Sequence, residues 1–410
     1  MKKWINPRDR PKSSTVHPSK SKSSLSIAGY VPETGGRLLS LDAVRGLLMI
    51  LMAIDHANYF IAHKHPVGPF WSMPMPQYKS MLGFLTRFVT HPCAAGFFFL
   101  MGVGMILFAE SRRHLGWTEG KIMRHFISRG FLLIILQQFL EDPAWLLGPT
   151  YTVKAPGGGE TVWFHFGVLY ALGAAMIIAA LLLRFASAML MSLSLIIVIV
   201  PQFLIPEPSK SDYLYSPLLR LILIPGQTGI MQVFYSVLPW LGLAGFGLVF
   251  GKWILQGYSR AYRRALIVGM AFVILFFVVR IGGGFGNIHP PDGSGWIGFL
   301  NVTKYPPSIA FLLLTLGANL LFLVLFSHSG AGLERWGKPL LVFGRTALFF
   351  YIVHLYLYAL IGLAVAGEKG TGFPMMYLLW FAGLVFLYPI CRWYGNFKKG
   401  KSADSIWRLF

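Results

Sequence analysis

The chain has 410 residues, of which 55% are hydrophobic and only 12% are charged, a composition far from that of soluble globular proteins. The net charge of +21 would suit a nucleic-acid partner only if the basic residues gathered on one soluble face. They are scattered between apolar runs instead. The composition therefore excludes nucleic acid as the expected partner and favours a polytopic protein embedded in a lipid bilayer.

Residues 1–36 are rich in Lys, Ser and Pro and lack the apolar core of a secretory signal. We expect them to form a disordered, basic cytoplasmic tail, with electrostatic attachment to the membrane surface as the less favoured alternative. Residues 37–396 form one predicted transmembrane domain, and residues 397–410 form a second basic cytoplasmic tail.

Apolar runs of about twenty residues predict an all-α bundle of about ten transmembrane helices. The runs lie near residues 41–63, 83–109, 127–148, 162–183, 186–205, 229–251, 265–283, 305–326, 339–365 and 374–394. Most Lys and Arg residues fall in alternate connecting segments that include both tails. The positive-inside rule therefore predicts that both termini are cytoplasmic.

The first run carries charge at both ends. Asp42 and Arg45 lie near its start, and Asp55 and His56 lie at its far end. Arg45 and His56 are separated by about 16 Å along a helix, roughly half of a hydrocarbon core. Ionisable residues at such depths are costly and predict a functional site. The alternative is that Arg45 only snorkels and His56 only marks the end of the helix.

Other predicted spans contribute ionisable residues at the same depths. The inner half holds Asp42, Arg45 and Arg345, and His354 lies near mid-depth. The outer half and its loops hold Asp55, His56, His63, His65, Arg87, His91, Glu141, Asp142, Arg280 and Lys304. Stable packing alone would use Gly, Ala, Ser and Thr. The pattern therefore predicts a polar conduit or cavity through the bilayer.

The residue types suggest which chemistry this cavity supports. A histidine beside a carboxylate, as in Asp55–His56, can act as a general base or a transient nucleophile. Arg45 and Arg345 can bind phosphates through paired hydrogen bonds. Arg87 and His91 are spaced to share a helix face, with a bend expected at Pro92. We interpret His165 and His289 as ordinary interface histidines.

Neither a metal ion nor a disulfide is expected. His56, His63, His65 and His91 could approach one another, but their spacing matches no metal signature. Cys93 and Cys391 fall near opposite membrane surfaces. The Gly- and Pro-rich outer loops at 63–71 and 282–292 are predicted to form re-entrant or capping structure rather than simple turns.

Several stretches resemble one family, the bacterial membrane proteins with a heparan-alpha-glucosaminide N-acetyltransferase-like catalytic domain, within the transmembrane acyltransferase superfamily. The stretches are Arg37–Gly46 with Met52–His56, Leu85–Gly102, Leu238–Gly242, Asn301–Ser308 and Phe343–His354. The resemblance implies transfer of an acyl group, typically acetyl, from a cytosolic acyl-CoA to an acceptor on the far side of the membrane. It also implies that His56 replaces a family asparagine and that His65, with His63 close by, lies nearest to the family's catalytic loop histidine.

We therefore predict an acyl-CoA-dependent acetyltransferase in a bacterial inner membrane, acting on an amino or hydroxyl group of a sugar, glycan or lipid-linked saccharide. Its predicted catalytic residues are His56, Asp55, His65 and His91. The predicted acyl-CoA site is Asp42, Arg45, Arg345 and His354. The predicted acceptor site is His63, Arg87, Glu141, Asp142, Arg280 and Lys304. Acyl-histidine transfer and direct attack both remain open, as does a homodimer. The rival functions are a transporter or flippase for an anionic or glycolipid substrate and a non-catalytic scaffold.

Overall fold

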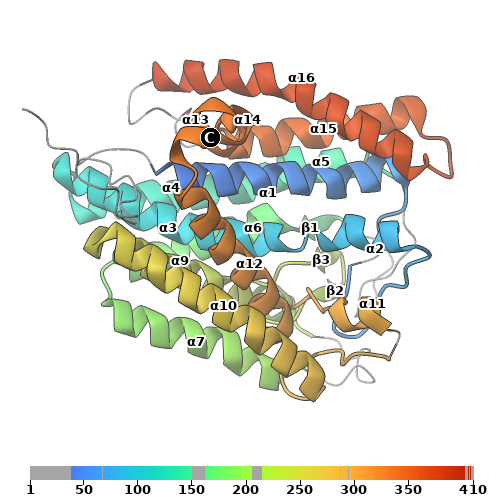
Figure 1. The fold of residues 1–410 in the computed structure, drawn as a ribbon, viewed down its shortest axis with the longest axis horizontal. Helices are drawn as coiled ribbons and strands as arrows, with labels where there is room; N and C mark the ends of the chain where they lie inside the picture. The colour runs from blue at the N-terminus through green and yellow to red at the C-terminus, as the bar shows by residue number, and fades with distance from the viewer. Residues whose placement is uncertain are drawn as a thin grey trace, which may run out of the picture.

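The computed structural model describes residues 38–66, 68–149, 162–205, 215–293, 295–401, 405 and 407. The predicted tail at 1–36 lies outside this part of the chain, as do residues 402–404, 406 and 408–410 of the predicted C-terminal tail. The described chain is a bundle of roughly parallel and antiparallel helices, drawn with their axes nearly horizontal in Figure 1.

The elements of the first half, in chain order, are α1 (Leu39–Ala57), η1 (Asn58–Ala62), α2 (Met81–Phe88), α3 (Pro92–His114), α4 (Glu119–Leu136), η2 (Gln137–Glu141), α5 (Asp142–Trp145), β1 (Phe164–Phe166), α6 (Val168–Leu182) and α7 (Ser187–Leu204). The second half contains α8 (Pro217–Ile222), β2 (Gly226–Thr228), β3 (Met231–Val233), α9 (Val237–Gln256), α10 (Tyr258–Gly282), α11 (Gly295–Leu300), α12 (Ile309–Ser327), α13 (Gly330–Arg335), α14 (Lys338–Arg345), α15 (Ala347–Val365) and α16 (Phe373–Lys399).

The predicted all-α polytopic membrane fold is confirmed. Within the described residues, seven helices are long and apolar enough to cross a membrane: α2 with α3, and α7, α9, α10, α12, α15 and α16. The other three predicted spans fall on α1 with η1, on α4 through α5, and on α6, whose 15 residues are apolar but short. The start of α1 and the end of α16 lie at the same end of the bundle (Figure 1).

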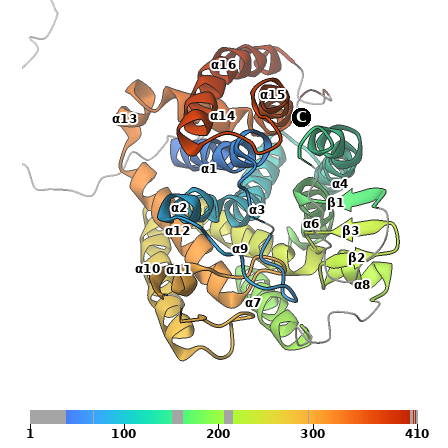
Figure 2. The ribbon, with the colours of Figure 1, turned by 90° about the vertical axis from the view of Figure 1, so that its right-hand side faces the viewer.

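Helix α1 lies at the centre of the arrangement, between α14–α16 on one side and α3 and α12 on the other (Figure 2). Its inner half crosses α14 at very short range because two glycines face the partner backbone. A side chain at Gly46 would collide with the Leu340 carbonyl, and one at Gly344 would collide with the Asp42 carbonyl. This close crossing sets Arg45 beside the end of α14, where Arg345 lies.

Three departures from regular helix shape the end of the bundle where the pocket lies. The helix is interrupted between Phe88 and Pro92, where the proline was expected to bend the chain. The π-helical segments η1 and η2 follow α1 and α4 directly, and such segments often mark functional positions. The predicted span 339–365 breaks at Thr346 into α14 and α15.

The prediction that residues 229–236 are helical is wrong, because part of this segment pairs with distant strands. A three-stranded sheet in the order β1-β3-β2 occupies the outer end beside α6 (Figure 2). Its register aligns His165 with Gln232 and Gln232 with Gln227. The expected capping structure is also present: the Trp71 amide donates to the Tyr305 carbonyl at 2.8 Å, which fastens loop 63–71 to the segment before α12.

Candidate active site

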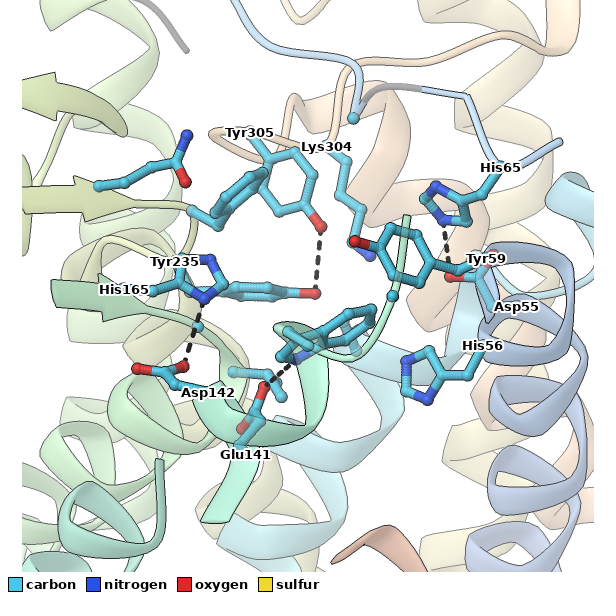
Figure 3. A pocket seen from close by; sticks show the side chains of 18 of the residues that line it. Asp55, His56, Tyr59, His65, Glu141, Asp142, His165, Tyr235, Lys304 and Tyr305 are labelled. Atoms are coloured by element: carbon cyan, nitrogen blue, oxygen red, sulfur yellow. Dashed lines mark hydrogen bonds and ion pairs between the residues drawn. The ribbon is translucent and has the colours of Figure 1, made fainter. Parts of the chain in front are cut away.

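A pocket of about 920 Å³ lies where α1, α2, α5 and α15 meet the sheet and the loop 63–71. Figure 3 shows two groups of polar side chains on opposite sides of it. Asp55, His56 and His65 form one group, and Glu141, Asp142 and His165 form the other. The pocket therefore gathers residues from segments that are distant in the sequence.

The orientation of His56 is set by a second histidine behind it. His56 Nδ1 lies 2.6 Å from His354 Nε2, and His354 Nδ1 lies 2.9 Å from the Phe350 carbonyl oxygen. Because that oxygen can only accept, His354 Nδ1 carries its proton, and neutral His354 Nε2 must accept from His56. His56 Nδ1 is thus the donor, and its Nε2 keeps a lone pair. No hydrogen bond among the described residues occupies His56 Nε2, and the ring lines the pocket.

Asp55, one residue earlier, organises a separate charged cluster. Its Oδ2 accepts from Arg87 Nη1 at 2.5 Å and lies 3.3 Å from His65 Nε2. Thr90 Oγ1 donates to the other carboxylate oxygen at 3.2 Å. Adjacent helical residues point about 100° apart, which explains why Asp55 orients His65 rather than His56. Burial lowers the pKa of His65, opposed by the Asp55 charge, so the ring is neutral near pH 7.

A cation and two phenols lie between the two groups of side chains (Figure 3). The Lys304 ammonium lies 5.5 Å and 5.1 Å from the ring centres of Tyr235 and Tyr305 and points toward the middle of the pocket (Figure 3). The Tyr305 hydroxyl donates to Tyr235 Oη at 3.4 Å. Burial raises the pKa of Tyr235, which keeps its hydroxyl protonated. The positive charges of Arg87 and Lys304 outnumber the charge of Asp55, so this part of the pocket favours a developing negative charge.

The opposite side of the pocket is built by η2, α5 and β1. Gln137 in η2 accepts from the Leu169 amide at the start of α6 and donates to Asp142 Oδ1 at 2.7 Å. The same Asp142 oxygen lies 3.3 Å from His165 Nδ1. Glu141 is 2% exposed and accepts from Trp145 Nε1 at 3.3 Å. Among the described residues, no three His, Cys, Asp or Glu side chains are grouped to hold a metal ion.

Three residues predicted for the catalytic and acceptor sites lie outside the pocket lining, as do the four predicted for acyl-CoA. His91 is buried between Phe88 and Phe311 and bonds the Arg87 carbonyl through Nδ1 at 2.9 Å. His63 faces the Glu368 carbonyl. Arg280 donates four hydrogen bonds to backbone carbonyls, those of His289, Gly298, Phe299 and Asn301. It donates a fifth to the side-chain oxygen of Asn287. Arg280 therefore holds the second outer loop together.

The four residues predicted to bind acyl-CoA lie in two separate parts of the structure. Asp42 accepts from Arg45 Nη1 at 3.2 Å and from Arg345 Nε at 3.1 Å, and Arg45 also bonds the Gly344 carbonyl at 3.0 Å. Arg45 and Arg345 keep 26% and 33% of their side chains exposed, so both can reach a ligand. His354 lies instead against His56 and is fully buried.

Sequence reasoning missed several residues that line the pocket: His165, Gln227, Gln232, Tyr235, Tyr305 and Tyr351. The strand residues gave no signal, since strands of three residues show no alternation long enough to recognise. Asp142, which lies near His165 in the structure, was recognised in the sequence, but His165 was not linked to it. Their proximity depends on contact between η2 and β1, where the Gln138 side-chain amide donates to the His165 carbonyl at 2.8 Å.

Comparison with known families bears directly on this site. Residues 37–282, more than half of the chain, match the family described as heparan-alpha-glucosaminide N-acetyltransferase, catalytic. The chain belongs to this family. It is also 30% identical over 149 residues to the mouse protein named heparan-alpha-glucosaminide N-acetyltransferase. That similarity covers 35% of this chain and 20% of the mouse protein.

The family match covers the first group of pocket residues, the second group and the inner arginine on α1. It ends at Gly282, so Lys304, Arg345 and His354 lie beyond it. The chain is thus an integral, multi-pass membrane protein that carries the catalytic region of an acetyltransferase family.

Proposed function

We propose that the protein transfers an acetyl group from acetyl-CoA, or another acyl group from its CoA thioester, to an amino or hydroxyl group of a sugar, glycan or lipid-linked saccharide. The observation that carries the proposal is the unoccupied lone pair of His56 Nε2 in a polar pocket, with its tautomer set by His354. A neutral imidazole held in this way can act as nucleophile or general base.

The inner arginines supply a site for the donor's phosphates. Arg45 and Arg345 share one carboxylate, Asp42, so the cluster has a net positive charge. Guanidinium groups bind phosphate through paired hydrogen bonds. Arg45 precedes His56 by eleven helical residues, or about 16 Å. An extended acyl-CoA bound with its phosphates at Arg45 would therefore direct its thioester toward His56.

The reaction itself has two possible routes. In direct transfer, the acceptor oxygen or nitrogen attacks the thioester carbonyl carbon, His56 Nε2 takes its proton, and the C–S bond breaks to release the CoA thiolate. In the covalent route, His56 Nε2 attacks the thioester carbonyl carbon and the C–S bond breaks to release the CoA thiolate. The acceptor then attacks the same carbon, its proton passes to a base, and the bond to His56 Nε2 breaks. Both routes place negative charge on the carbonyl oxygen, which Lys304, Arg87 and the Tyr235 hydroxyl are positioned to stabilise.

The proposal includes an orientation. With Arg45 and Arg345 at the cytoplasmic side of a bacterial inner membrane, the donor would enter from the cytosol and the acceptor from the far side. The distribution of Lys and Arg along the chain supports this direction.

The experiment uses purified protein in lipid nanodiscs with radiolabelled acetyl-CoA and a panel of aminosugars and neutral sugars. The wild type should release CoA and form labelled product only with an accepted sugar. His56→Ala should reduce turnover at least a hundredfold, the size expected for loss of a general base or nucleophile. His114→Ala, at an exposed histidine outside the pocket, is the matched control. Unchanged turnover in His56→Ala would remove His56 from the mechanism.

A further inference from the structure

The side of the pocket opposite His56 contains an ordered row of polar side chains. His165, Gln232 and Gln227 are register partners across β1, β3 and β2, and all three line the pocket. Residues directly opposite each other on neighbouring strands point to the same face of a sheet. Three polar side chains on one face, directed into a cavity, need a polar partner there.

Several atoms on this side have no hydrogen-bond partner among the described residues although water barely reaches them. They are Glu141 Oε2, His165 Nε2 and Gln227 Nε2. A buried polar atom without a partner costs about 1–3 kcal/mol, so His165 Nε2 and Gln227 Nε2 favour a polar ligand in the pocket, whereas the Glu141 carboxyl also interacts with the Tyr351 hydroxyl. Glu141 and Gln227 are only 2% and 3% exposed.

The contacts within this group bear on what the histidine can do. Asp142 Oδ1 lies 3.3 Å from His165 Nδ1, and its negative charge favours a proton on that nitrogen. His165 Nε2 then keeps a lone pair. Gln137 steadies Asp142 from behind through its amide nitrogen. The pair has the arrangement of a general base oriented by a carboxylate.

We infer that the β1-β3-β2 sheet is the acceptor subsite and that, in the covalent route, His165 beside Asp142 is the base that deprotonates the acceptor as it attacks the acetyl group on His56 Nε2. The inference rests on the proposed function and assigns its acceptor half to residues separate from His56. A ligand bearing several hydroxyl groups fits the unpaired atoms: hydroxyl protons reach Glu141 Oε2 and His165 Nε2, and a hydroxyl oxygen accepts from Gln227.

The transfer step balances with these residues. The acceptor's O–H or N–H bond breaks as its oxygen or nitrogen bonds to the acetyl carbonyl carbon, and the proton passes to His165 Nε2. The bond between that carbon and His56 Nε2 breaks with its electron pair on the nitrogen. His165 then returns the proton to solvent.

The test compares His165→Gln with His114→Gln in nanodiscs. His114 also lies against a carboxylate, with its Nε2 3.4 Å from Glu110 Oε1. It is exposed, however, and does not line the pocket. Turnover of labelled acetyl-CoA is measured with D-glucosamine and with water as acceptors. Donor binding is measured separately, by the shift in thermal midpoint that acetyl-CoA causes.

We expect His165→Gln to lower turnover about a hundredfold with either acceptor, while the shift caused by acetyl-CoA and the thermal midpoint stay at wild-type values. His165→Gly should regain activity when imidazole is added, which a purely structural histidine would not allow. Asp142→Asn should lose about tenfold, and His114→Gln should match the wild type.

Two results would overturn the inference while leaving the proposed function intact: turnover in His165→Gln within threefold of wild type, or a parallel loss of turnover, donor binding and thermal stability that imidazole does not restore. If the wild type itself turns over acetyl-CoA with neither acceptor, the proposed function fails, and this inference fails with it.

Discussion

Replacing His354 probes the link between the buried histidine pair and the proposed chemistry. In His354→Leu, His56 Nδ1–H loses the acceptor that now lies 2.6 Å away. An unpaired buried donor costs about 1–3 kcal/mol, so His56 will move its proton to Nε2, where the polar pocket can satisfy it. The lone pair needed for catalysis is then disfavoured by that amount. At about 1.4 kcal/mol per tenfold, turnover should fall about 5- to 150-fold.

His354→Gln is the matched control, since an amide oxygen can accept the same hydrogen bond. The assay is steady-state turnover of labelled acetyl-CoA, with the Michaelis constant for the donor and the thermal midpoint measured for each variant. We expect the Leu variant to lose turnover at an unchanged donor Michaelis constant and the Gln variant to recover most of it. Full activity in a folded Leu variant, or equal losses in both variants, would refute the tautomer argument.

Three further predictions follow from other parts of the structure. Arg345→Ala should raise the Michaelis constant for acetyl-CoA about tenfold to hundredfold, the effect expected for loss of a charge-assisted hydrogen bond. The control Arg335→Ala, at an exposed position on α13, should leave it unchanged. Steady-state kinetics with varied acetyl-CoA measure both. Asp55→Asn leaves the Arg87 guanidinium buried without its counter-charge and should lower the thermal midpoint more than the double replacement Asp55→Leu/Arg87→Met; the reverse order would contradict the ion-pair account. Burial lowers the pKa of His65 below its usual value near 6.5. As the pH falls below about 6.5, the unfolded chain therefore binds a proton that the folded chain does not, and the thermal midpoint should decrease from pH 7 to 5. The decrease should be less steep in His65→Gln, and parallel curves for the two proteins would refute the argument.

The membrane fold was largely predictable because hydrophobic length is a local signal. Each of the ten apolar runs overlaps a helix in the described chain. The break at Thr346 and the switch to strands near Met231 were not predictable from apolar character alone, since both depend on contacts with distant segments. The interruption before Pro92 was predictable because proline removes a backbone donor at a known position.

The sequence predicted those site residues that could be identified from their depth in the membrane alone. Asp55, His56, His65, Arg87, Glu141, Asp142 and Lys304 were all assigned to the outer half and all line the same pocket. Depth does not fix direction around a helix or loop, which is why His63, His91 and Arg280 were grouped with them although they face other partners. His165 was missed for the complementary reason: one histidine in an apolar run carries no sign of the carboxylate that the fold brings to it.

The most direct test of the central claim is a structure of the protein with acetyl-CoA bound in nanodiscs. The account predicts phosphate density at Arg45 and Arg345 and the thioester carbonyl carbon within about 3.5 Å of His56 Nε2, the separation of groups ready to react. A thioester bound away from this pocket, or phosphates bound at its outer end with Arg45 and Arg345 untouched, would contradict it.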